Sequence, residues 1–341
     1  MYEKLVTFEE EKRKEHLYLL FNSIFVCACL MPVFEAVFKF PLSIFSGIQN
    51  DAISWFLTTL LYPVCSSGAV LLPFFIYNVR MQKPLRDKLK KSKGKASVLW
   101  YVFGIISVAA IVPVLVYVGQ LFCDFLISRG YVLTENLPDL GDSIPANIFS
   151  TVYTSAVSAV LLELAFRGVA AEKLSYANTA LAVILPALIS AMYTYSFIKI
   201  PYLFVTGLII GWCYLKTKSL YLTIAMNFAA NIAFCVILLV RENTDIAYIS
   251  IIGAMLSVGA FVVLAIKNGL KVKYPEPKDS EEEYERLTKK EAFFGTFKAF
   301  AFWIFVFMFF FQVFFTYLDK PMREAEDSNE NYQSSSMITE E

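Results

Sequence analysis

Histidine is almost absent from this chain, and its scarcity limits the chemistry that the protein can perform. Of 341 residues one is histidine, His16, and it precedes the first long apolar run. A general base needs a pKa near the working pH and must reach the proton that it removes, while a catalytic metal needs about three protein ligands. The apolar runs contain no histidine for either purpose. We therefore expect no metal and no cofactor.

Paired cysteines, an excess of one charge and nucleotide-binding motifs are also missing. The six cysteines all lie within apolar runs, and none has the paired spacing of a zinc or redox motif, so we interpret them as small buried hydrophobic residues. The formal net charge is zero, and no nucleotide-binding fingerprint occurs. Basic residues gather in short stretches between apolar runs, as membrane topology requires. We therefore expect no nucleic-acid partner.

Apolar residues are what the chain has in abundance. Hydrophobic residues make up 57% of it, against about 45–50% in soluble domains. Runs able to cross about 30 Å of hydrocarbon cover residues 17–40, 52–79, 97–123, 147–166, 179–198, 201–215, 219–240, 246–266 and 293–317. The sequence predicts an all-α, polytopic transmembrane helical bundle of about nine spans. The run 201–215 is the shortest, and its two glycines suggest a broken or tilted helix.

The distribution of lysine and arginine predicts the orientation, because short cytoplasmic loops carry more of them. Residues 80–95 hold eight basic residues and one acidic residue, which places this loop in the cytoplasm. The alternation of the spans then places the N-terminus (1–16) and a charged linker (267–292) in the cytoplasm as well. The acidic tail, 318–341, is predicted to be external and disordered, because it lacks apolar residues for a core.

The segments between these loops give three groups of helices. Residues 17–146 form the N-terminal transmembrane helices, 147–240 a core, and 241–317 the C-terminal helices. An integral membrane protein with this plan contacts lipid along its spans. We expect its location to be a bacterial cell membrane.

Polar residues within the core runs are the candidate functional residues. Glu163 and Arg167 lie four residues apart on one helix face, as do Asn227 and Asn231 in a later run. Ionisable groups in hydrocarbon are costly unless they are paired or line a wet cavity. We expect these side chains, together with hydroxyls of the run 179–198, to line one polar pocket. Its residues would be Glu163, Arg167, Tyr193, Thr194, Asn227 and Asn231.

A purely structural interpretation of the same residues stays open. A Glu–Arg pair can neutralise itself, and asparagines often hydrogen-bond one membrane helix to the next. Glu35 and Lys39 form a second such pair in the first run. It is predicted to lie near the outer membrane interface, where the lysine can extend towards water.

The core run resembles a known family of intramembrane proteases. The sequence Leu-Glu-Leu-Ala-Phe-Arg-Gly at 162–168 is followed about 60 residues later by Asn227-x-x-x-Asn231. This order is similar to the CPBP family, the CAAX protease and bacteriocin-processing (Abi) proteins, and the resemblance covers about 147–235. Its motifs are Glu-Glu-x-x-x-Arg, Phe-x-x-x-His and His-x-x-x-Asn. The resemblance implies a CPBP/Abi-like core in which the first glutamate and the histidine of the second motif activate water.

This sequence departs from the family pattern at the positions that carry chemistry. Leu162 stands at the first glutamate, while Glu163 and Arg167 match the rest of the first motif. The second motif aligns with Tyr193-x-x-x-Phe197 or Thr194-x-x-x-Ile198, and neither ends in histidine. Asn227 stands at the histidine of the third motif, and Asn231 matches its asparagine. The resemblance therefore implies a member without the catalytic glutamate and histidines.

Three functions are compatible with these residues. The first is a non-catalytic membrane scaffold or regulator that binds another integral or membrane-anchored protein, such as a cell-envelope enzyme or a sensor kinase. The second is an active CAAX-type protease or bacteriocin-immunity peptidase that uses Glu163 as its sole base. The third is a transporter, against which the absence of an internal repeat argues. The first is the leading hypothesis.

Overall fold

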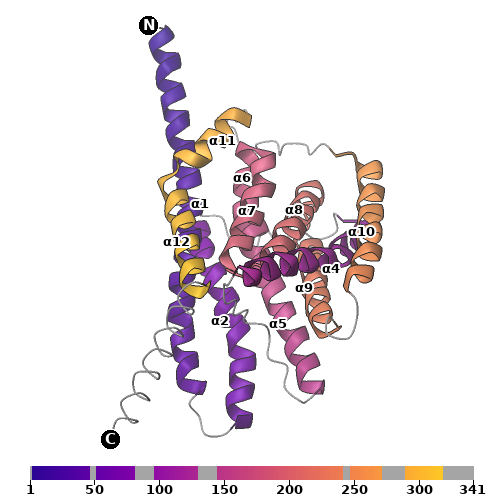
Figure 1. Ribbon diagram of the computed structural model, residues 1–341. Coiled ribbons are helices and arrows are strands. Elements are labelled where there is room, and N and C mark those ends of the chain that lie inside the picture. The colour runs from indigo at the N-terminus through magenta and orange to yellow at the C-terminus, as the bar shows by residue number, and fades with distance from the viewer. Residues whose placement is uncertain are drawn as a thin grey trace, which may run out of the picture.

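The structure of the chain is a computed structural model that describes residues 2–46, 51–80, 96–129, 144–240, 246–270 and 289–317. Within these ranges every regular element is a helix (Figure 1). The elements are α1 (Tyr2–Ser46), α2 (Asp51–Arg80), α4 (Val98–Ser128), α5 (Ile144–Ala165), η1 (Phe166–Ala171), α6 (Glu172–Ala177), α7 (Thr179–Tyr193), α8 (Lys199–Thr217), α9 (Leu220–Val240), α10 (Ile246–Asn268), α11 (Lys289–Lys298) and α12 (Phe300–Tyr317). The predicted all-α class is confirmed.

Seven of the described helices are long and apolar enough to cross a membrane, which confirms a polytopic membrane protein. Two of the nine predicted runs differ. The run 179–198 contains α7, whose 15 residues extend about 22 Å and so fall short of a full span. The run 293–317 is divided between α11 and α12, and its apolar part, Phe300–Phe315, is also too short.

The run 201–215 is a complete helix instead of a broken one. It lies within α8, which continues without interruption from Lys199 to Thr217. Its two glycines serve close packing against α7. A Cβ atom on Gly207 would lie 2.9 Å from the Cβ of Ala187, and one on Gly211 would lie 3.3 Å from a methyl group of Val183. Small residues four apart let two membrane helices approach in this way.

An asparagine separates α6 from α7. The backbone of Asn178 is extended, and its side-chain oxygen accepts hydrogen bonds from the amides of Ala180 at 2.9 Å and Leu181 at 3.2 Å. Asparagine is a preferred residue at this position because it satisfies amides that have no partner within the helix. The cap ends one helix and starts the next, which brings α7 against η1 and α8.

The buried residues form two hydrophobic cores, and the buried residues of η1 belong to the first of them. The first contains Phe25 of α1, Phe74 of α2 and Phe166 of η1, and Phe302 of α12 packs on it. The second joins α4, α8, α9 and α10, with residues such as Met226 at its centre. Figure 1 shows α1 and α12 at one side of the molecule and α10 at the other.

Several predicted segments lie outside the described residues. These are most of the basic loop 80–95, most of the linker 267–292 and the tail 318–341. The predicted cytoplasmic N-terminus and external C-terminus therefore stay predictions, as does the division of the chain into three groups of helices.

Candidate functional site

Glu163 is the centre of the candidate site, and it is completely buried. It lies on α5, two residues before the last residue of that helix, Ala165, which the π-helical segment η1 follows. One oxygen, Oε1, accepts a hydrogen bond from Nη1 of Arg167 at 2.9 Å and another from Nδ2 of Asn227 at 2.8 Å. The side chains of Glu163 on α5 and Asn227 on α9 are therefore in direct contact, close together as predicted.

Arg167 connects this carboxylate to a third helix. Its Nη2 donates a hydrogen bond to the main-chain oxygen of Gly207 on α8 at 2.9 Å, and the side chain is 3% exposed. Without a side chain at Gly207, the guanidinium can approach the backbone of α8. We call Glu163, Arg167 and Asn227 the Glu163 cluster, and it joins α5–η1, α8 and α9.

The π-helical segment surrounds Arg167. Residues Phe166–Ala171 are all buried and have π-helical geometry. A π turn accommodates an extra residue in an α-helix, and such turns occur frequently at functional sites. Here the segment begins three residues after Glu163 and contains Arg167. No local pattern in the sequence predicts this π turn.

Two buried polar atoms of the Glu163 cluster have no hydrogen-bond partner among the described residues. They are Oε2 of Glu163 and Nε of Arg167. Buried charged groups normally have all their hydrogen-bonding capacity satisfied, because desolvation is costly. Oε2 can therefore accept a hydrogen bond from a water molecule or from a polar group of a ligand.

The remaining predicted residues of α9 and α7 lie outside the cluster. Asn231, one turn beyond Asn227, is half-buried, and no described side chain hydrogen-bonds to its amide. Thr194 donates from its hydroxyl to the main-chain oxygen of Ala191 at 2.8 Å. Thr223, which the sequence analysis did not select, is fully buried one turn before Asn227 and donates to the main chain at 2.9 Å.

Tyr193 belongs to a second polar cluster. Its hydroxyl donates a hydrogen bond of 2.5 Å to Oε2 of Glu35 on α1. Oε1 of Glu35 lies 2.6 Å from the ammonium of Lys39 and accepts a hydrogen bond from Ser66 of α2 at 3.3 Å. We call Glu35, Lys39, Ser66 and Tyr193 the Glu35 cluster. It joins α1, α2 and α7, a role that the spacing of Glu35 and Lys39 alone did not indicate.

Metal-ligating side chains do not gather at either cluster. Within the described ranges, no group of three or more histidine, cysteine, aspartate or glutamate residues is placed to hold an ion. The donors at the Glu163 cluster are one carboxylate, one guanidinium and one amide. This set can hold a structural ion pair and can donate hydrogen bonds to a polar group.

Together, the fold and the site define a helical membrane protein whose core helices are joined by a buried Glu–Arg–Asn cluster. Residues 144–233 match the family model described as Rce1-like, type II CAAX prenyl endopeptidase Rce1-like. This segment of the chain is therefore similar to that family, which confirms the resemblance found in its motifs. All three residues of the Glu163 cluster lie within the matched segment. No curated protein and no solved structure matches the chain.

Proposed function

We propose that this protein is a non-catalytic member of the Rce1-like family that acts as a membrane scaffold or regulator for another membrane protein. The observation that carries the proposal is the state of Glu163. The single oxygen Oε1 accepts from both Arg167 and Asn227, while Arg167 also donates to the main chain of α8. These contacts use the carboxylate to join three helices.

The chemistry of peptide hydrolysis needs more than this cluster provides. Water must be activated by a base, and the leaving amine must receive a proton. Glu163 is paired with Arg167, and the position of the third-motif histidine is occupied by Asn227. An asparagine can donate a hydrogen bond to an oxyanion, but it cannot serve as the base. The chain's single histidine, His16, lies far from this segment in the sequence.

The partner in this proposal is another integral or membrane-anchored protein. The Phe-rich helix α12 supplies a surface for it, because several of its aromatic side chains are exposed, among them Phe307 at 68% and Phe310 at 62%. Aromatic side chains contribute large apolar contact area to interfaces. Lipid covers the same face when no partner is bound. The proposal places the protein in a cell membrane, with the N-terminus in the cytoplasm.

Two measurements test this function together. The tagged protein is purified from its native membrane in mild detergent, and the stoichiometry of co-purifying membrane proteins is determined for the wild type and for Glu163→Gln. The same preparations are assayed for cleavage of a prenylated CAAX peptide. We expect a near-equimolar partner in both preparations and no cleavage in either. Cleavage by the wild type that Glu163→Gln abolishes would contradict the proposal.

A second function has one observation in its favour. Oε2 of Glu163 is buried and without a partner among the described residues, so it has the capacity to bind a water molecule. A peptidase that uses Glu163 as its sole base would attack the substrate with that water. The cleavage assay distinguishes the two functions, because only the peptidase requires the carboxylate for activity.

A further inference from the structure

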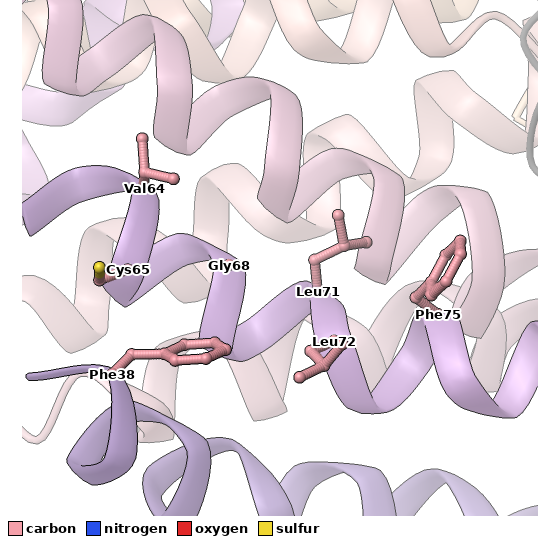
Figure 2. A pocket seen from close by; sticks show the side chains of 7 residues that line it. All are labelled: Phe38, Val64, Cys65, Gly68, Leu71, Leu72 and Phe75. Carbon is pink, nitrogen blue, oxygen red and sulfur yellow. The ribbon is translucent and has the colours of Figure 1, made fainter. Parts of the chain in front are cut away.

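An apolar groove of about 400 Å³ lies between α1 and α2, away from the Glu163 cluster (Figure 2). Residues of α2 from Val64 to Phe75 form its wall, and the ring of Phe38 on α1 lies beside Gly68 (Figure 2). Gly68 lies in the middle of this wall, where it presents no side chain. All the residues that line the groove are apolar.

The groove has the length of one membrane leaflet. From Val64 to Phe75, α2 rises about 16 Å at 1.5 Å per residue, which is about half of a 30 Å hydrocarbon layer. The apolar span of α2 runs from Thr59 to Val79. The groove therefore lies across the middle of this span, with five residues of the span before Val64 and four after Phe75.

A lysine marks the outer end of the groove. Lys39 follows Phe38 in the sequence and lies three residues before Leu42, where the apolar span of α1 ends. Its ammonium is 5.3 Å from the centre of the Tyr62 ring, and Tyr62 lies two residues before the groove begins on α2. The side chain is 41% exposed. An ammonium has three N–H donors, so its contact with Glu35 leaves capacity for another acceptor.

We propose that this groove is a binding site for a glycerophospholipid, with one acyl chain between α1 and α2 and the phosphate at Lys39. The apolar wall and its length of about 16 Å fit an acyl chain, and the cation of Lys39 lies next to Phe38 in the chain, three residues before the end of the α1 span. Glu35 also accepts hydrogen bonds from Tyr193 and Ser66, so its carboxylate keeps two partners when Lys39 turns towards a phosphate.

Gly68 provides a way to fill the groove without disturbing the fold. A Cβ atom built at this position meets no heavy atom within 4 Å, so a larger side chain would occupy the groove itself. Gly259 on α10 is a matched control, since a Cβ atom there also meets nothing within 4 Å. Gly68→Leu and Gly259→Leu therefore add the same side chain to two membrane-spanning helices, and only the first blocks the proposed site.

The experiment is a lipid titration of the purified full chain in detergent, followed by native mass spectrometry. The probes are dipalmitoyl phosphatidylglycerol and a diacylglycerol with the same chains but no phosphate. We expect the wild type and Gly259→Leu to bind one phosphatidylglycerol with equal Kd, and Gly68→Leu to bind it at least about tenfold more weakly. Lys39→Gln should weaken phosphatidylglycerol binding about fivefold, as expected for one lysine at an anionic headgroup, and leave diacylglycerol binding unchanged.

Two results would overturn the proposal. Equal binding by Gly68→Leu and Gly259→Leu would show that the acyl chain does not occupy the groove. An unchanged affinity of Lys39→Gln for phosphatidylglycerol would show that the phosphate does not lie at Lys39. Thermal unfolding of each variant is measured in parallel, and a variant whose Tm falls is replaced by Gly68→Val or Lys39→Met, for which the same outcomes apply.

Discussion

Replacing Arg167 with leucine removes the cation of the Glu163 cluster and leaves its carboxylate buried. In the wild type, Arg167 is the cation that balances Glu163, and it also donates to the main chain of α8. After the substitution, Asn227 still donates a hydrogen bond to the carboxylate, but no cation balances its charge. We expect this single substitution to lower the stability of the protein strongly, because the buried carboxylate of Glu163 loses its counter-charge.

The magnitude follows from the burial of the pair. Glu163 is 0% exposed and Arg167 3% exposed, and removing one partner of such a pair typically costs about 3–5 kcal/mol. Glu163→Gln should cost less, about 1–3 kcal/mol, because an amide oxygen can still accept from Asn227 and Arg167 keeps its hydrogen bond to the main-chain oxygen of Gly207. The double variant Glu163→Gln/Arg167→Leu contains neither charge, so we expect it to be more stable than Arg167→Leu alone.

This double-mutant cycle is measured by reversible unfolding in mixed detergent micelles, with thermal unfolding as a second readout. A coupling energy of about 1–3 kcal/mol is typical for residues in direct contact. The reasoning is refuted if the double variant is no more stable than Arg167→Leu, because the two charges would then not compensate each other inside the protein. Equal stability of Arg167→Leu and Glu163→Gln would also contradict an intramembrane ion pair.

Three further predictions concern other parts of the fold. Gly207→Val should destabilise the protein by about 1–3 kcal/mol, measured by thermal unfolding, because its Cβ would lie 2.9 Å from that of Ala187; an unchanged Tm would contradict close packing of α7 on α8. Tyr193→Phe should cost about 1 kcal/mol in the same assay, since it removes one hydrogen bond to Glu35. A protease added to sealed, right-side-out vesicles should remove a C-terminal tag and spare an N-terminal one, and the reverse pattern would refute the predicted orientation.

The sequence alone predicted that the protein spans a membrane and that Glu163 and Asn227 lie close together. Long apolar runs predict membrane helices because no other environment accommodates so many apolar side chains on all faces of a helix. Glu163 and Asn227 are polar residues within such runs, so burial against each other is the arrangement of least cost. The order of the motifs that contain them resembles the CPBP family, and residues 144–233 match the Rce1-like family model.

The number of membrane-spanning helices and the place of Tyr193 could not be derived in the same way. Hydropathy does not report where a helix ends, and Asn178 with the turn after Tyr193 limits α7 to 15 residues. Tyr193 lies on α7, which packs against η1 and α8 and also contacts α1. Whether its hydroxyl reaches Glu163 or Glu35 depends on how α7 packs, and the structure brings it to Glu35.

The sequence by itself determined that this is an all-α membrane protein with an ion pair inside one helix, because apolar length and i, i+4 spacing are local properties of the chain. Only the tertiary structure decided that Arg167 donates a hydrogen bond to the main-chain oxygen of Gly207 and that one oxygen of Glu163 accepts from two donors. It also decided that Glu35 on α1 accepts hydrogen bonds from Ser66 of α2 and Tyr193 of α7. Those contacts join residues far apart in the chain, and they depend on close helix packing at positions such as Gly207 that no local pattern specifies.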